Sequence, residues 1–91
     1  MIETTVIFIQ MEEKIRRILS EQILDPEEVD ELQAETLLIS GGYLDSISTL
    51  RFATFLEEEF NIVFMPHEVT RDNLDSLELI QSFLVRKMEN E

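Results

Sequence analysis

The sequence contains no cysteine, which excludes a disulfide framework and a thiolate metal site and gives no support to secretion. No stretch approaches the roughly 20 apolar residues that a membrane-spanning helix requires. The segment from Met1 to Ile9 is apolar, but it lacks the basic start, the long apolar core and the small-residue cleavage site of a signal peptide. These absences together predict a cytoplasmic protein without a membrane span.

Basic residues are also scarce, because seven Lys and Arg stand against twenty Asp and Glu, for a formal net charge of -13. Binding to nucleic-acid phosphates needs clustered Lys and Arg, so nucleic acid is not an expected partner. A surface this acidic favours basic protein surfaces, since complementary charge speeds and orients encounters. The 91 residues suffice for one small domain, which we expect to be a monomer without a large enclosed active site.

The first third of the chain has the pattern of two helices. Apolar residues at a 3.6-residue period predict a first helix from Met11 to about Ile23. Asp25 before Pro26 has the form of an N-cap followed by a first helical residue. This pair predicts a short helix or turn from Pro26 to about Gln33.

Two longer helices are predicted farther along the chain. One runs from Asp45 or Ser46 to Phe60, and an apolar stripe on it should be buried. That stripe consists of Thr49, Phe52, Ala53, Leu56 and Phe60. The last helix begins near Asp75, which forms a capping-box pattern with Glu78. Its expected buried face consists of Leu77, Ile80, Phe83, Leu84 and Met88.

The remaining segments contain no convincing pair of strands. Pro66 to Val69 predicts a single turn, and 70–73 predicts a loop. Residues 1–10 form an extension whose Val, Ile, Phe and Thr content favours a strand. The alternatives are an extra helical turn or two, a flexible tail, or a start codon upstream of a domain that begins at Met11. The predicted fold class is therefore all-α, a small four-helix bundle formed by residues 11–91, with a long loop between its first and second main helices.

The long loop is acidic, because every charged residue between Asp25 and Asp45 is Asp or Glu. An EF-hand loop counted from Asp25 would need Gly at its sixth place and Glu at its twelfth, where this chain has Asp30 and Thr36. We therefore expect a solvated loop and no metal site. The apolar run 37–39 should hold the loop against the helices.

Gly41 and Gly42 allow a sharp turn that delivers Ser46 to the first turn of the third helix. On spacing alone, a serine at this place is a helix N-cap. The side of the helix opposite to the buried stripe offers a mixed apolar and charged surface to a partner. This predicted partner face consists of Ile47, Leu50, Arg51, Thr54 and Glu58.

The stretch Leu44-Asp45-Ser46-Ile47 and the helix end 56–62 resemble the acyl carrier protein superfamily, whose motif is Asp-Ser-Leu. Ile47 stands where the family most often has Leu, and it keeps an apolar side chain beside the serine. The resemblance covers roughly residues 11–88. It implies a bundle of the acyl-carrier type in which Ser46, beside Asp45, receives 4'-phosphopantetheine from coenzyme A through a phosphodiester.

The same resemblance implies that the thiol of the phosphopantetheine arm carries an acyl or aminoacyl group as a thioester. The implied partners are a phosphopantetheinyl transferase and the enzymes that load and transfer the acyl or aminoacyl group. Fatty-acid carriers commonly have an acidic residue where this chain has Arg51, which favours a specialised carrier over the housekeeping fatty-acid carrier. The sequence leaves the cargo open.

A second Asp-Ser-Leu stands at Asp75-Ser76-Leu77, and we do not expect it to be modified. Only 15 residues follow Ser76, fewer than the helix, loop and further helices that follow the modified serine in the family. A helix cap also explains Asp75 and Ser76 completely.

We expect no enzyme activity and no catalytic residue. Nucleophilic catalysis by Ser46 would need a histidine base and an orienting acid, and the only histidine is His67, in the expected turn. No Gly-x-Ser-x-Gly pattern surrounds Ser46. The alternative from another class is an unmodified acidic adaptor module that uses the same helix face.

Overall fold

The computed structural model describes residues 2–89, and all the regular elements within this range are helices, so the fold class is all-α as predicted. Helix α1 (Ile2–Ile18) continues into the π-helical turn η1 (Leu19–Ile23). Residues 2–10 therefore do not form the strand that their composition favours, and the alternative of extra helical turns describes them. No Gly or Pro interrupts residues 1–25, and no strand occurs within residues 2–89 that could pair with this segment, so the helix continues through it.

Helix α2 (Pro26–Glu31) begins as predicted, with Asp25 as its N-cap and a capping box completed by Glu28. The Asp25 amide donates to Glu28 Oε1 at 3.2 Å, which satisfies a donor that the helix leaves free. The helix ends two residues before the predicted Gln33, at the start of the long loop 32–45.

Arg16 of α1 holds the end of α2 in place. Its guanidinium donates to the carbonyl oxygens of Val29 at 3.0 Å and Leu32 at 2.9 Å. Glu12, one turn earlier on α1, pairs with the same guanidinium at 2.8 Å. The first helix and the start of the long loop are thus joined by charge-assisted hydrogen bonds as well as by apolar packing.

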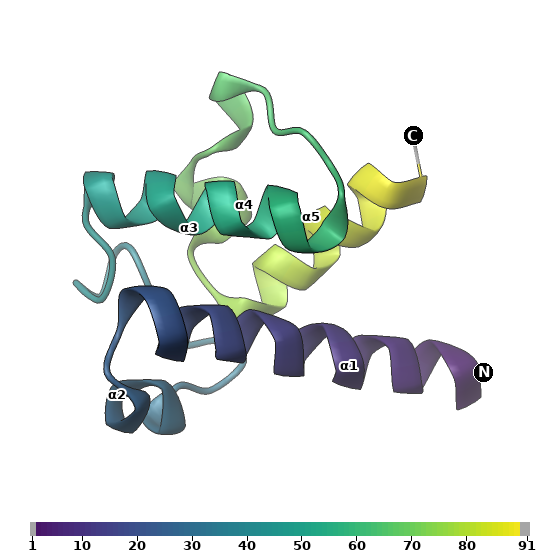
Figure 1. Cartoon of the computed structure of the whole chain (residues 1–91), viewed down its shortest axis with the longest axis horizontal. Coiled ribbons are helices and arrows are strands. Elements are labelled where there is room, and N and C mark those ends of the chain that lie inside the picture. The colour runs from purple at the N-terminus through teal and green to yellow at the C-terminus, as the bar shows by residue number, and fades with distance from the viewer. Residues whose placement is uncertain (1, 90–91) are drawn as a thin grey trace.

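Helix α3 (Ser46–Phe60) has the predicted bounds, and Asn61 ends it in the left-handed conformation with φ 55°. Figure 1 shows α1 and α3 running one above the other along the long axis, and the two helices are in contact. Helix α5 (Leu77–Glu89) packs against α1, and α2 lies beside η1. Within the described residues, no helix is long and apolar enough to cross a membrane.

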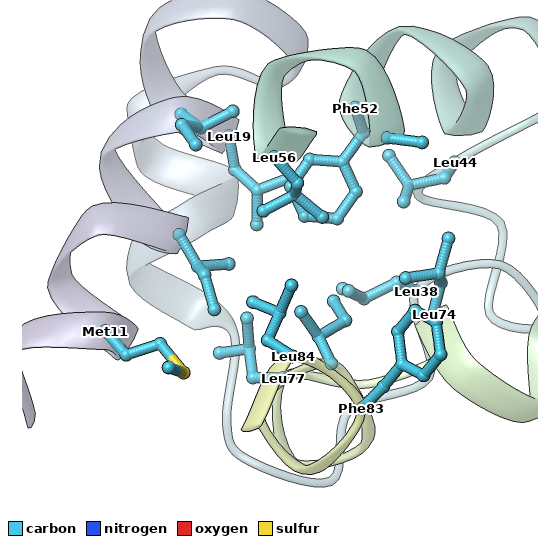
Figure 2. Close-up of a cluster of buried hydrophobic side chains, with 14 of the residues drawn as sticks. Met11, Leu19, Leu38, Leu44, Phe52, Leu56, Leu74, Leu77, Phe83 and Leu84 are labelled. Carbon is cyan, nitrogen blue, oxygen red and sulfur yellow. The ribbon is translucent and has the colours of Figure 1, made fainter. Parts of the chain in front are cut away.

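The core lies where these helices meet, and Figure 2 shows its side chains converging from α1, α3, α5 and the long loop. Its largest fully buried side chains are Ile15, Leu19, Leu38, Phe52, Leu56, Leu74, Leu77, Ile80 and Leu84. The predicted stripe of α3 is buried except for Phe60, which is half-buried near the end of the helix. On α5 the predicted buried face holds except for Met88, which lies exposed in the last turn.

The segment before α5 differs from the prediction. The expected loop 70–73 contains the single-turn helix α4 (Arg71–Leu74), while the expected turn is the 3-10 helix η2 (Pro66–Glu68). The expected capping box of Asp75 and Glu78 is wrong, because Ser76 Oγ accepts from the Leu79 amide at 3.1 Å and is the residue that caps α5.

Candidate functional site

Ser46 is the first residue of α3, and its side chain is exposed. Asp45 precedes it as the N-cap, and its carboxylate accepts from the Ser48 amide at 2.8 Å. The Asp45 carbonyl accepts from the amide of Thr49 at 2.9 Å and from its hydroxyl at 2.6 Å. The first turn of the helix is therefore fixed by side-chain and backbone bonds around an accessible serine hydroxyl.

The Asp45 carboxylate is ionised at neutral pH. The hydrogen bond from the Ser48 amide, followed by that from the Ser48 side chain, lowers the pKa of Asp45 below its ordinary value of 3.8. A negative group therefore lies directly beside Ser46, at the end of the helix where the macrodipole is positive.

The glycines that precede Ser46 are needed for the turn. Gly42 has φ 89°, a left-handed conformation that L side chains rarely adopt. A Cβ at Gly41 would collide with the carbonyl oxygen of Leu37. The chain then returns to the core at Leu44, which is buried and whose amide donates to the carbonyl of Leu38 at 2.8 Å.

Asp75 holds the long loop against the rest of the protein. Its Oδ1 accepts from the amides of Ile39 at 2.7 Å and Ser40 at 2.9 Å. Its Oδ2 accepts from the Ser40 hydroxyl at 2.6 Å, and its carbonyl accepts from the Leu38 amide at 2.7 Å. Sequence reasoning missed this role, because the partners lie 35 and 36 residues away and no spacing rule connects them.

The second Asp-Ser-Leu is therefore a structural element. Ser76 is 4% exposed and its oxygen caps α5, so its hydroxyl is not available to a modifying enzyme. Ser46 differs in both respects, since it is exposed and Asp45 performs the capping for it.

An open cleft of about 570 Å³ lies beside Ser46. It is bounded by the long loop, the start of α3 and the segment 69–71 that leads into α4. The lining residues are Ile39, Leu44, Asp45, Ser46, Thr49, Leu50, Val69, Thr70 and Arg71. The cleft thus combines apolar side chains with the serine hydroxyl, one carboxylate and one guanidinium.

All five residues of the predicted partner face are exposed, but they do not surround Ser46 equally. Ile47, which is 72% exposed, adjoins the serine, and Leu50, which is 60% exposed, lines the cleft. Glu58 lines a separate hollow between α3 and the first helix. At 1.5 Å per residue it lies about 16 Å along the helix from Ile47.

The polar residues of the partner face between Ile47 and Glu58 are Arg51 and Thr54, and both have intramolecular partners. The Thr54 hydroxyl donates to the carbonyl of Leu50 at 3.0 Å. The Arg51 guanidinium donates to the carbonyl of Gln22 at 3.0 Å, which links α3 to the C-terminal end of η1. Arg51 is therefore both an exposed charge and a contact between two helices.

The only histidine of the chain, His67, is exposed in η2 and is not among the residues that line the cleft. Within residues 2–89, no group of three or more His, Asp or Glu is arranged to hold a metal ion. The surroundings of Ser46 within the described residues thus consist of the cleft, without a histidine in its lining and without a group of metal ligands.

Searches with this chain found no matching protein family, no matching curated protein and no matching solved structure. The geometry around Ser46 and the short motif that contains it are therefore the basis for inferring a function.

Proposed function

We propose that this protein is a carrier of the acyl carrier type, in which Ser46 is modified with 4'-phosphopantetheine. The observation that carries the proposal is the exposed Ser46 hydroxyl at the start of a 15-residue helix, on the rim of an open cleft. The motif Asp45-Ser46-Ile47 places an acid before the serine and an apolar residue after it, as the carrier family does.

The chemistry needs an accessible hydroxyl rather than an activated one. In the modification, Ser46 Oγ forms a phosphodiester with the phosphopantetheine part of coenzyme A, adenosine bisphosphate leaves, and the serine proton passes to a base. A phosphopantetheinyl transferase would supply that base and its metal ion. Because the base would come from the transferase, the cleft does not need a histidine, and none is among its lining residues.

The start of α3 suits a serine that carries a phosphodiester. Positive dipole charge and amide groups at a helix N-terminus stabilise a nearby anion, by typically 0.3–1 kcal/mol at an exposed site. Because the Asp45 side chain binds the Ser48 amide, the cap of this turn does not use the Ser46 hydroxyl, which is left for modification.

A carrier must also meet several enzymes and leave them again. The proposed docking surface is the part of α3 nearest the serine, with Ile47 and Leu50 as apolar anchors. The net charge of -13 would steer the carrier to basic partner surfaces, namely the transferase and the enzymes that load and transfer the acyl or aminoacyl group.

The test is intact mass after incubation of the protein with coenzyme A and a transferase of broad specificity. Wild type should gain one phosphopantetheinyl group, and Ser46→Ala should gain none. Ser48→Ala is a matched control, because this serine lies in the same helical turn and is only half-buried. Ser76→Ala is a second control, and both control variants should be modified like wild type.

Two outcomes would refute the proposal. A gain of the same mass by Ser46→Ala would show that another residue accepts the arm. An unmodified wild type, alongside a known carrier that the same transferase modifies, would instead favour the unmodified acidic adaptor.

A further inference from the structure

Arg71 differs from the other basic residues of the protein, because those six all have intramolecular partners. Their contacts are the ion pairs of Lys14 and Arg17 with Glu59, Arg16 with Glu12 and Lys87 with Glu68, the Arg51 bond to Gln22, and Arg86 over the Phe83 ring. Within residues 2–89, Arg71 makes no hydrogen bond, ion pair or contact with an aromatic ring. Its side chain is exposed in a protein with twenty acidic residues, any of which would be an attractive partner for it.

Two carboxylates of this region, those of Asp75 and Asp45, do not form an ion pair with Arg71. Asp75, one turn farther along, feels the charge of Arg71, but both of its oxygens already accept from Ile39 and Ser40. Asp45 belongs to the same cleft as Arg71, but its carboxylate accepts from the Ser48 amide. No residue within 2–89 occupies the five N–H donors of the guanidinium, which are therefore available to a ligand as far as the described residues are concerned.

Arg71 and Ser46 line the same cleft from different elements, α4 and α3. The apolar residues of the cleft come from the loop, from α3 and from the segment before α4: Ile39, Leu44, Leu50 and Val69. A guanidinium prefers carboxylates and phosphates, which it binds with two parallel hydrogen bonds. The cleft therefore has the chemistry to hold an oxyanion attached to a short apolar chain.

We propose that Arg71 binds an oxyanion of the group attached to Ser46 and so holds that group in the cleft. This inference rests on the proposed function. The oxyanion has two possible sources, the phosphodiester at Ser46 itself or a carboxylate on the carried acyl group. Either one would be brought to Arg71 by the covalent attachment of the arm.

Covalent attachment matters because the rest of the protein repels anions. With a net charge of -13, a free phosphate or carboxylate in solution is kept away from the surface. An anion on the arm is held near the cleft at an effective concentration that is about millimolar for a short flexible linker. The ionised Asp45 repels the same anion, which favours its position on the Arg71 side of the cleft.

The experiment loads wild-type protein with three different groups. Coenzyme A supplies the bare arm, glutaryl coenzyme A an arm with a terminal carboxylate, and pentanoyl coenzyme A an arm of the same chain length without that charge. Intact mass confirms complete loading before any measurement. NMR of the Arg71 Nε–H group then reports its chemical shift and its exchange with water, both of which change when the guanidinium binds an oxyanion.

If the phosphodiester is bound, all three loaded forms should shift the Arg71 signal and slow its exchange about tenfold relative to the unloaded protein. If the cargo carboxylate is bound, only the glutaryl form should do so. Both results support the proposal and identify the source of the oxyanion. An Arg71 signal that is the same in the unloaded protein and in all three loaded forms overturns it.

Variants give a second measurement that does not depend on the arginine signal. Arg71→Ala should change the ³¹P shift of the bare arm if the phosphodiester is bound, or the ¹³C shift of the cargo carboxylate in the glutaryl form if the carboxylate is bound. Arg86→Ala is the matched control, because Arg86 is also exposed and lies outside the cleft. If Arg71→Ala changes these shifts relative to wild type no more than Arg86→Ala does, the inference is refuted. Failure to load wild type would refute the proposed function instead.

Discussion

The Ser40 hydroxyl donates a 2.6 Å hydrogen bond to Asp75 Oδ2, which joins the long loop to the start of α5 across 35 residues of sequence. The other oxygen of this carboxylate accepts from the amides of Ile39 and Ser40, and Asp75 itself is only 7% exposed. A buried carboxylate with three donors is a strong local constraint, because hydrogen bonds to a charged group exceed those between neutral groups. The loop that leads to Ser46 is thus positioned by a residue far away in the sequence.

Replacing Asp75 by alanine should destabilise the protein by about 2–4 kcal/mol, because it leaves three donors of the loop without their acceptor. Asp72→Ala is a suitable control, since Asp72 is exposed in the adjacent α4 and should change stability by less than about 0.5 kcal/mol. Urea unfolding followed by circular dichroism measures both. Equal losses for the two variants would show that Asp75 does not anchor the loop.

The same carboxylate should make stability depend on pH. Burial alone raises the pKa of Asp75, but the hydrogen bonds from the Ser40 hydroxyl, the Ser40 amide and the Ile39 amide outweigh it and hold the pKa below its ordinary value of 3.8. A carboxyl with a lowered pKa in the folded state contributes stability above its unfolded pKa, and this stability is lost as the pH falls through the folded value.

Wild type should therefore lose stability as the pH falls below about 5, and Asp75→Asn should lose less over the same range because position 75 no longer titrates. Some acid dependence should remain in the variant, since the Met65 amide and Lys87 also lower the pKa of Glu68. Midpoints of urea unfolding between neutral and acidic pH measure the difference. Parallel curves for the two proteins would contradict the prediction.

The sequence predicts those parts of the structure whose causes are local. The bounds of α3 and the N-cap of α2 at Asp25 follow from residues within one or two turns of each other. The N-cap that spacing alone indicates at Ser46 is wrong by one residue, because Asp45 caps α3 and Ser46 is its first helical residue. The same local spacing predicts a capping box for Asp75 with Glu78, but distant amides and the Ser40 hydroxyl bind the Asp75 carboxylate instead. No pattern within a single helix could have revealed those partners.

In the N-terminal segment the local composition itself is misleading. It favours a strand, but no strand within residues 2–89 could pair with it. β propensity measures how well a side chain fits a pleated, half-buried surface, and residues 6–9 are exposed on a helix instead. The cleft beside Ser46 was equally beyond prediction, since Arg71 joins it through a short helix that the sequence indicated only as a loop.

The core of α3 offers a graded test of the packing in Figure 2. Leu56 is fully buried, so Leu56→Ala should cost about 2–5 kcal/mol. Phe60 is half-buried, with Lys14 at 5.9 Å from the centre of its ring, so Phe60→Ala should cost less. Chemical unfolding of both variants measures the order, and a larger loss at Phe60 would show that the apolar face of α3 is assigned incorrectly.

The last prediction concerns Arg51, which is exposed on α3 and donates to the carbonyl of Gln22. Arg51→Ala removes this single exposed bond and should cost no more than about 0.5–1.5 kcal/mol. Arg51→Glu also reverses the charge, so a comparison of the two variants separates the loss of the contact from the effect of the new charge.

If the proposed docking surface includes Arg51, Arg51→Glu should slow loading by an enzyme that presents an acidic group to it and speed loading by an enzyme that presents a basic one. Arg51→Ala should have a smaller effect in the same direction. Initial rates of loading with the native loading enzyme and with an unrelated fatty-acid synthase enzyme measure both.

Ile47→Ala tests the apolar anchor beside Ser46 in the same assay. Because Ile47 is 72% exposed, a slower rate with Ile47→Ala at unchanged stability would indicate a lost contact with the partner enzyme. Unchanged rates for all three variants, with native circular dichroism, would place the docking surface elsewhere on the protein.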